Sequence, residues 1–107
     1  MKPRDDLSAA DRDRLFAAFE TAIREIPTVR TVRLGRRISH GAGYEARMPA
    51  ADYLVIIEFD DLAGLTTYLQ HPAHENLGAR FNDSLAAALI YDFDDVELEA
   101  LKELGPR

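Results

Sequence analysis

The chain has 107 residues, with 13 lysine or arginine residues, 19 aspartate or glutamate residues and a formal net charge of -6 at pH 7. This length is typical of one domain whose core folds without the support of disulfides or metal. The sequence contains no cysteine, so it can form neither a disulfide nor a zinc site with thiolate ligands. The acidic balance disfavours nucleic acid as a partner. The apolar runs are shorter than a membrane span and the polar N-terminal segment has no signal-peptide core, so we expect a cytoplasmic protein without a membrane partner.

The first predicted element is a helix that begins after Ser8. Ser8 and Asp11 have the spacing of a capping box, in which the hydroxyl accepts a hydrogen bond from the first turn. Apolar residues then recur at steps of three and four until Pro27 ends the pattern. The residues of this stripe are Leu15, Phe19, Ala22, Ile23 and Ile26. The stripe predicts a helix that covers one face of a sheet.

A half-exposed strand is predicted over residues 29–39, where Val32 and Leu34 alternate with arginines and Gly35 marks an irregularity. The four arginines of this segment fit the solvated face of an edge strand, and an anion site is the alternative. They are Arg30, Arg33, Arg36 and Arg37. Residues 40–50 form a polar connection in which His40 is expected at the surface.

The next strand is predicted over residues 53–59, which are apolar almost without interruption. Such a run is typical of a strand that is buried on both faces. In a chain of this length the helices can cover only one face of the sheet. A second copy of the same sheet is the simplest cover for the other face, so we predict a homodimer.

Two helices are predicted next, separated by Pro72, which cannot continue the first helix but suits the start of the second. Asp60 or Asp61 caps the first of them, and its inward residues are predicted to be Leu62, Leu65 and Leu69. The inward stripe of the second is predicted to be His74, Leu77, Phe81 and Leu85. From about Ala88 a strand is expected, with Leu89, Tyr91 and Phe93 on one face, followed by a possible helical tail at 96–107.

The break at Pro72 lies between Tyr68 and His74 and indicates a candidate site. His74 falls in the first turn of a helix, where the partial positive charge disfavours imidazolium, so we expect a neutral ring that can accept a proton. The alternative is that His74 only fills a gap between two helices. A metal site of His71, His74, Glu75 and His40 is disfavoured, because His71 is predicted to point away from the others.

The order of these motifs resembles the stress-responsive A/B barrel (Dabb) family. The resemblance rests on Ile26-Pro27-Thr-Val29, on Gly35, and on the runs at 53–59, 68–74 and 90–93. It implies that residues 1–107 are a single α+β domain with a ferredoxin-like antiparallel sheet and helices on one face, forming a dimeric α/β-barrel.

The family includes plant stress-induced proteins and a plant polyketide cyclase that closes a ring without a cofactor. The resemblance aligns the catalytic tyrosine and histidine of that cyclase with Tyr68 and His74. It implies a pocket lined by Tyr53, Leu77, Phe81 and Tyr91. Our first hypothesis is a stress-response module that binds a small apolar or aromatic molecule. The alternative is a cofactor-independent cyclase or lyase with His74 as general base and Tyr68 as hydrogen-bond donor, and a monooxygenase of related fold is a third.

The N-terminus departs from the family pattern. Members of the family open with a central strand before the first helix, and here only Met1-Lys2-Pro3 corresponds to its end. We expect that translation begins upstream of Met1 and that additional residues complete the sheet. Otherwise the open strand edges must be paired by the C-terminal tail or by strand exchange between subunits.

Overall fold

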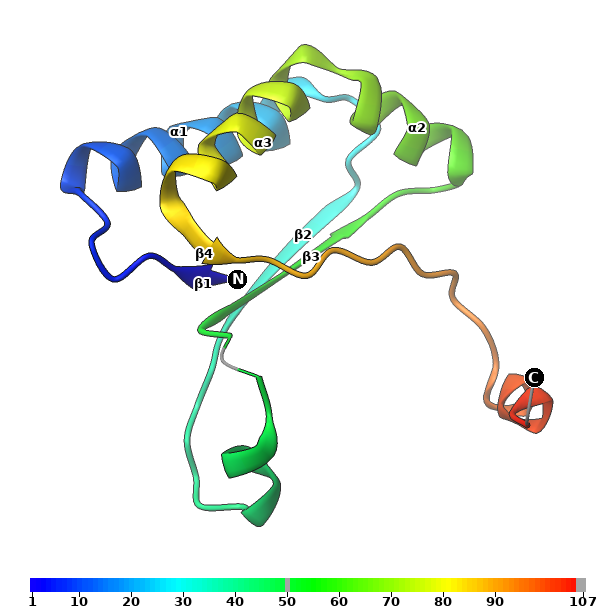
Figure 1. Cartoon of the computed structure of the whole chain (residues 1–107). Coiled ribbons are helices and arrows are strands. Elements are labelled where there is room, and N and C mark those ends of the chain that lie inside the picture. Colours follow the sequence, from blue (N-terminus) through cyan, green and yellow to red (C-terminus); the bar gives the residue numbers. More distant parts are fainter. Residues whose placement is uncertain (50, 106–107) are drawn as a thin grey trace.

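The computed structural model describes residues 1–49 and 51–105 and has a layer of helices on one side of an antiparallel sheet (Figure 1). Residue 50 of the predicted connection and residues 106–107 of the predicted tail lie outside the described residues. The helices are α1 (Ala9–Glu25), α2 (Leu62–Gln70) and α3 (Pro72–Ser84). The strands are β1 (Lys2–Pro3), β2 (Thr31–Arg36), β3 (Tyr53–Glu58) and β4 (Leu85–Ala87).

The strands form two two-stranded sheets, which hydrogen bonds of Met1 connect. β2 pairs with β3 from Thr31 opposite Glu58 to Arg36 opposite Tyr53, and β1 pairs with β4, both antiparallel. The Met1 ammonium donates to the Tyr53 carbonyl (2.7 Å), and the Met1 carbonyl accepts from the Asp52 N–H (2.8 Å). The pair β1-β4 therefore lies beside the pair β3-β2 at Met1, with β1 next to β3. This is the α+β arrangement that the sequence predicts.

The core is formed mainly by the helices. Ser8 caps α1 as predicted, with its Oγ accepting from the Asp11 N–H at 3.1 Å. Small side chains on α1 allow α3 to pack closely against it. The fully buried apolar residues are Ala18, Ala22, Ile26, Tyr68, Ala73 and Leu77. Ile23, which was predicted to face inward, is exposed because the buried stripe of α1 runs through the alanines instead.

The inward face of α2 differs from the prediction. Asp61 caps this helix, with its Oδ1 accepting from the Gly64 N–H at 2.8 Å. Leu65 is half-buried, but Leu62 and Leu69 are exposed, and the buried residues of α2 are Gly64 and Tyr68. The prediction relied on the spacing of the leucines. The structure instead buries Gly64 and Tyr68, each of which lies one position before a leucine. The helix is thereby turned so that Tyr68 enters the core.

The sheet is covered far less well than the helices. In the single chain Tyr53, Leu54 and Ile56 are all exposed, although the sequence predicts a strand buried on both faces. Only Ile57 of this strand packs against the helical core. The radius of gyration is 16.3 Å, whereas a compact chain of this length has about 13 Å. The β2–β3 hairpin and the C-terminal residues project from the helical core and account for the difference (Figure 1).

The predicted strand at residues 88–93 is wrong. β4 ends at Ala87, and residues 88–97, which we call the arm, have no regular structure. The reason is that β1 has only two residues, so the described chain offers no strand to pair with beyond Ala87. Leu85 belongs to β4 and not to the face of α3. The arm exposes the large apolar side chains of Leu89, Ile90, Tyr91, Phe93 and Val96.

Two 3-10 helices complete the described chain. η1 (Gly43–Arg47) lies in the connection between β2 and β3, and η2 (Leu98–Glu103) follows the arm. His40 is exposed, as predicted, beside Tyr44 and Glu45. None of the helices in residues 1–49 and 51–105 is long and apolar enough to cross a membrane.

Candidate functional site

Tyr68 and His74 meet at the junction of α2 and α3. Tyr68 is in the last turn of α2, and His74 is the third residue of α3, after the break that Pro72 imposes. Their ring centroids are 4.7 Å apart and the ring planes are inclined by 60°, an edge-on contact. Tyr68 is 8% exposed and His74 is half-buried. The break thus brings together the two residues that the sequence selected.

Apolar groups surround the pair. The Phe59 ring packs against the Tyr68 ring with a centroid distance of 5.1 Å. Leu77, one turn after His74 on α3, is 3% exposed and belongs to the same buried cluster as Tyr68. The phenol ring therefore lies in an apolar environment contributed by Phe59, which follows β3, and by α3. Phe59 was not predicted as a site residue, and its position directly after the apolar run of β3 is the only sequence signal for it.

Burial raises the pKa of the Tyr68 phenol above its ordinary value, because an apolar environment disfavours the phenolate. The hydroxyl is therefore protonated at neutral pH. Within the described residues it makes no hydrogen bond. The hydroxyl is available to donate to an oxygen atom of a bound molecule.

His71 has a different role from His74. Its Nδ1 accepts a hydrogen bond from the Ala73 N–H at 3.0 Å, so this ring is the N-cap of α3. The cap fixes the start of α3 and with it the position of His74. The sequence signal for this role is the proline at the first helical position, which makes the preceding residue the cap. Residues 1–49 and 51–105 contain no group of three side chains suited to hold a metal ion.

The four predicted lining residues fall into two groups. Leu77 is in the core beside Tyr68, and Phe81 packs on Phe19 with ring centroids 5.6 Å apart. Tyr53 is 44% exposed on β3, and Tyr91 is 68% exposed on the arm, where it contacts Phe93. The single chain therefore does not gather all four residues around one cavity. Tyr53 lies on β3, and Tyr91 lies on the arm, which has no regular structure.

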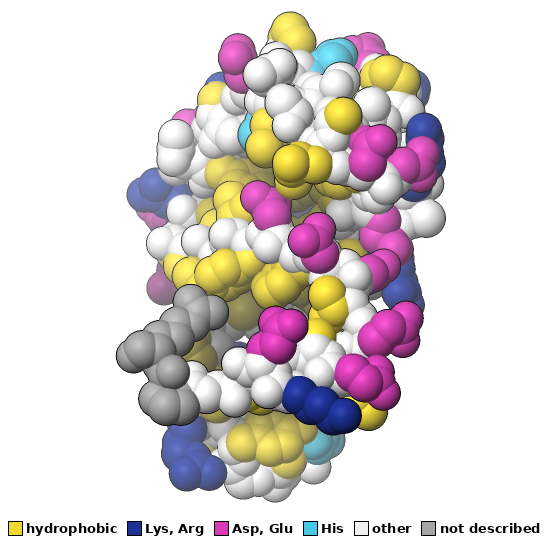
Figure 2. All heavy atoms as spheres, turned by 90° about the vertical axis from the view of Figure 1, so that its right-hand side faces the viewer, with side chains coloured by type: hydrophobic (Ala, Val, Ile, Leu, Met, Phe, Trp, Pro, Cys, Tyr) yellow, Lys and Arg dark blue, Asp and Glu magenta, His cyan; other side chains and the backbone are white. Residues whose placement is uncertain are grey.

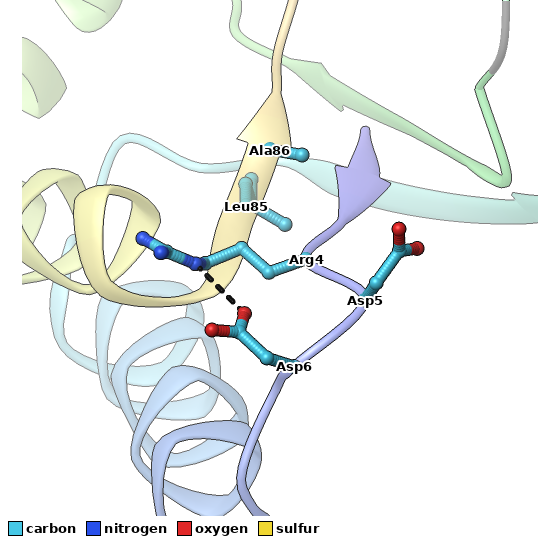
Figure 3. Close-up of a pocket in the computed structure, with 5 residues that line it drawn as sticks. All are labelled: Arg4, Asp5, Asp6, Leu85 and Ala86. Atoms are coloured by element: carbon cyan, nitrogen blue, oxygen red, sulfur yellow. Dashed lines mark hydrogen bonds and ion pairs between the residues drawn. The ribbon is translucent and has the colours of Figure 1, made fainter.

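Two clefts of the single chain lie away from Tyr68 and His74. The cleft in Figure 3 has a volume of about 450 Å³ and is lined by Arg4, Asp5, Asp6, Leu85 and Ala86. Arg4 donates to Asp6 across this cleft at 3.2 Å. Three of its five lining residues are charged, which does not suit an apolar molecule. A second cleft near Thr28 and Thr67 includes the ion pair of Arg30 with Asp60. Neither cleft includes Tyr68 or His74.

The chain matches the model of one protein family and is similar to several known proteins. The family model described as the stress responsive A/B barrel domain (Dabb) matches residues 1–95. The chain is 20% identical to olivetolic acid cyclase of Cannabis sativa over 93 residues, which cover 87% of this chain and 88% of the cyclase.

Solved structures support the same fold. The protein At3g17210 of Arabidopsis thaliana is 18% identical, with a TM-score of 0.72 and coverage of 91% of this chain and 90% of that chain. A dimeric ferredoxin-like protein of unknown function from Thermobifida fusca is 21% identical, with a TM-score of 0.59 and coverage of 80% and 76%. A dimeric protein with a ferredoxin-like fold from Bacteroides fragilis is 22% identical, with a TM-score of 0.54 and coverage of 86% and 88%. The predicted ferredoxin-like α+β fold is confirmed.

Proposed function

Because the chain belongs to the stress responsive A/B barrel domain family, we propose that it is a homodimer that binds a small apolar or aromatic molecule beside Tyr68 and His74. A cytoplasmic location and a role in the stress response are part of the same proposal. No cofactor is required for binding of this kind.

The contact between Tyr68 and His74 carries the proposal. An edge-on pair of rings at 4.7 Å presents two polar groups, a phenolic hydroxyl and an imidazole, at the end of an apolar cluster. Ligand sites are typically apolar with a small number of placed polar groups. An aromatic molecule with one carbonyl or hydroxyl group matches this arrangement, because its ring can contact the half-buried Phe59 while its oxygen meets the phenol.

The exposed apolar side chains support a homodimer. In the single chain the outer face of β3 exposes Leu54 and Ile56, and the arm exposes five further large apolar residues. Extensive exposed apolar surface of this kind marks an interaction site in a soluble protein. Two solved proteins of similar fold are described as dimeric. Analytical ultracentrifugation is expected to show a dimer, and a monomer at all concentrations would contradict this part of the proposal.

Native mass spectrometry with a panel of aromatic and β-keto compounds tests the binding site. We expect at least one compound to bind the wild type and to bind His74→Gln and Tyr68→Phe at least about tenfold more weakly, which corresponds to about 1.4 kcal/mol. His40→Gln and Tyr44→Phe are the matched controls, because both residues lie on the exposed connection between β2 and β3. Equal binding by all five proteins would show that the site lies elsewhere.

A cofactor-independent cyclase or lyase is the second candidate function. It is supported by the similarity to olivetolic acid cyclase and by the pairing of a protonated phenol with an imidazole. In such a reaction His74 would take a proton from a carbon next to a carbonyl, and Tyr68 would donate a hydrogen bond to the enolate oxygen. The enolate carbon would then bond to a second carbonyl carbon, and the proton would return to the new alkoxide.

Turnover separates the two candidate functions. If the protein is an enzyme, a bound β-keto compound is converted by the wild type, and His74→Gln lowers the rate about 100-fold or more without unfolding the protein. Product analysis by mass spectrometry measures the conversion, and circular dichroism checks the fold. If compounds of the panel bind but none of them is converted, the result favours a binding module over an enzyme.

A further inference from the structure

The end of the β2–β3 hairpin carries arginines that have no carboxylate partner. We call residues 33–48 the hairpin end. Outside it, every arginine that the structure describes forms an ion pair with an aspartate or a glutamate. Within residues 1–49 and 51–105, the arginines of the hairpin end form none, and all of them are exposed. They are Arg33, Arg36, Arg37 and Arg47. The hairpin end therefore presents positive charge to the solvent.

Residues 94–104, which we call the acidic segment, carry the opposite charge. They include five carboxylates and a single lysine, Lys102. The carboxylates are Asp94, Asp95, Glu97, Glu99 and Glu103. All five are exposed, and none forms an ion pair with another residue that the structure describes. The acidic segment and the hairpin end are thus complementary in charge, as the two sides of a specific interface are.

Both surfaces also expose apolar side chains among their charges. η2 lies within the acidic segment and is a 3-10 helix, in which residues three apart lie on the same side because one turn takes three residues. Leu98 and Leu101 therefore form an apolar side of η2, and they are 75% and 57% exposed. The hairpin end exposes four large apolar side chains, which are Leu34, Ile38, Tyr44 and Met48. Apolar groups with a charged rim are typical of a protein–protein interface.

Within one chain the two surfaces lie apart. Figure 1 shows the arm leading η2 away from the helical layer, while the connection that contains η1 projects from the other end of β2 and β3. Figure 2 shows acidic side chains over the middle of one face and hydrophobic side chains at its lower end, the level at which Figure 1 draws η1. A second copy of the chain can supply the partner surface, and a two-fold axis then forms the contact twice. η2 lies outside residues 1–95, which the family model matches, so this contact uses residues beyond the matched domain.

We propose that the acidic segment of one copy docks on the hairpin end of a second copy of this chain. The inference rests on the proposed homodimer and adds to it a contact that the sheet does not supply. Leu98 and Leu101 pack against the exposed apolar side chains of the hairpin end, and the carboxylates of the segment pair with its arginines. These charged groups form no ion pairs with other described residues, so the contact breaks none.

Paired charge reversals in the full chain test the contact through the dissociation constant of the dimer, measured by analytical ultracentrifugation. The segment variant is Glu97→Lys with Glu99→Lys. The hairpin variant is Arg36→Glu with Arg47→Glu, and the combined variant carries all four substitutions. Circular dichroism checks that each variant is folded.

Asp5→Lys with Glu20→Lys is the matched control. Both residues are exposed and form no ion pair among the described residues, so the control changes the net charge as the segment variant does without altering either surface. We expect the segment and hairpin variants each to raise the dissociation constant at least about tenfold, and the control to change it less than about threefold. The combined variant should recover most of the lost affinity. Added salt should weaken the wild-type dimer more than the dimer of the segment variant, because salt screens exposed charges.

An unchanged dissociation constant in the segment and hairpin variants would overturn the contact and leave the homodimer intact. If both variants weaken the dimer and the combined variant does not recover, the two surfaces do not meet. A wild type that is monomeric at all concentrations would contradict the homodimer itself, and the contact with it.

Discussion

The helical layer of this chain buries its apolar side chains and caps its helix ends more fully than the sheet side buries its side chains and pairs its strands. The helical layer buries its apolar stripe, caps its helices and positions the Tyr68–His74 pair with contacts among nearby residues. The sheet side has a two-residue β1, an unpaired edge on β3 and an exposed arm. The comparison indicates that packing within the helical layer positions the candidate site, whereas the sheet side leaves β3 and the arm exposed. The four predictions below test this contrast.

Leu77→Ala should have the largest effect, because it removes a fully buried side chain from the helical core. Truncation of this kind costs about 2–5 kcal/mol of the free energy of unfolding. Urea denaturation followed by circular dichroism measures this value, and Leu89→Ala on the arm is the control. If Leu77→Ala and Leu89→Ala cost the same, the helical layer is not the stable part of the molecule.

Asp61→Ala should have the next largest effect, because it removes the cap of α2. The loss of an N-cap costs about 0.5–2 kcal/mol. Asp60→Ala is the matched control, since Asp60 makes an exposed ion pair with Arg30 and such pairs contribute about 0–1 kcal/mol. Thermal denaturation compares the two variants. A smaller loss for Asp61→Ala than for Asp60→Ala would contradict the assigned cap.

Alkaline pH should weaken the wild type more than Tyr68→Phe. Burial raises the pKa of Tyr68 in the folded chain, so the unfolded chain loses this proton first as the pH rises through about 10. Above that pH the unfolded state binds fewer protons, and the free energy of unfolding falls until the folded state also ionises. Denaturation at pH values from neutral to alkaline measures the fall. If the free energies of unfolding of the two proteins change in parallel with pH, the ionised Tyr68 phenol is accessible to water in the folded chain.

Phe93→Ala should have the smallest effect on the single chain, because this side chain is 88% exposed. Substitutions at exposed positions usually change the free energy of unfolding by less than about 0.5 kcal/mol. Denaturation at concentrations where sedimentation shows a monomer gives this value. A loss above about 2 kcal/mol under these conditions would mean that the arm packs on its own chain.

The sequence predicts well those features that depend on neighbouring residues. Ser8 was predicted as the cap of α1, Asp60 or Asp61 as the cap of α2, Pro72 as a break, and Tyr68 and His74 as a pair, because each follows from spacing within a few residues. The predictions for Leu62 and Leu69 were wrong, since leucine spacing does not determine how a short helix is turned against its neighbours. Gly64 and Tyr68, four residues apart, were the informative pair on that helix.

Features that depend on distant strands were predicted less well. The alternation of residues 89–93 is typical of a strand, but a strand forms only where a neighbour pairs with it, and β1 ends the pairing at Ala87. Tyr53 and Tyr91 are exposed in the single chain, so their place in a ligand pocket stays a prediction. The contact between the Phe59 and Tyr68 rings was not predicted, nor was the role of His71 as the cap of α3.

An NMR titration with a compound that binds in the mass-spectrometry panel tests whether the binding site lies beside Tyr68 and His74. We expect the ring signals of Tyr68 and His74 to shift together and to saturate with the same dissociation constant, while the ring signals of His40 and Tyr44 do not move. Shifts confined to residues around Arg4 and Leu85, with Tyr68 and His74 unchanged, would contradict it.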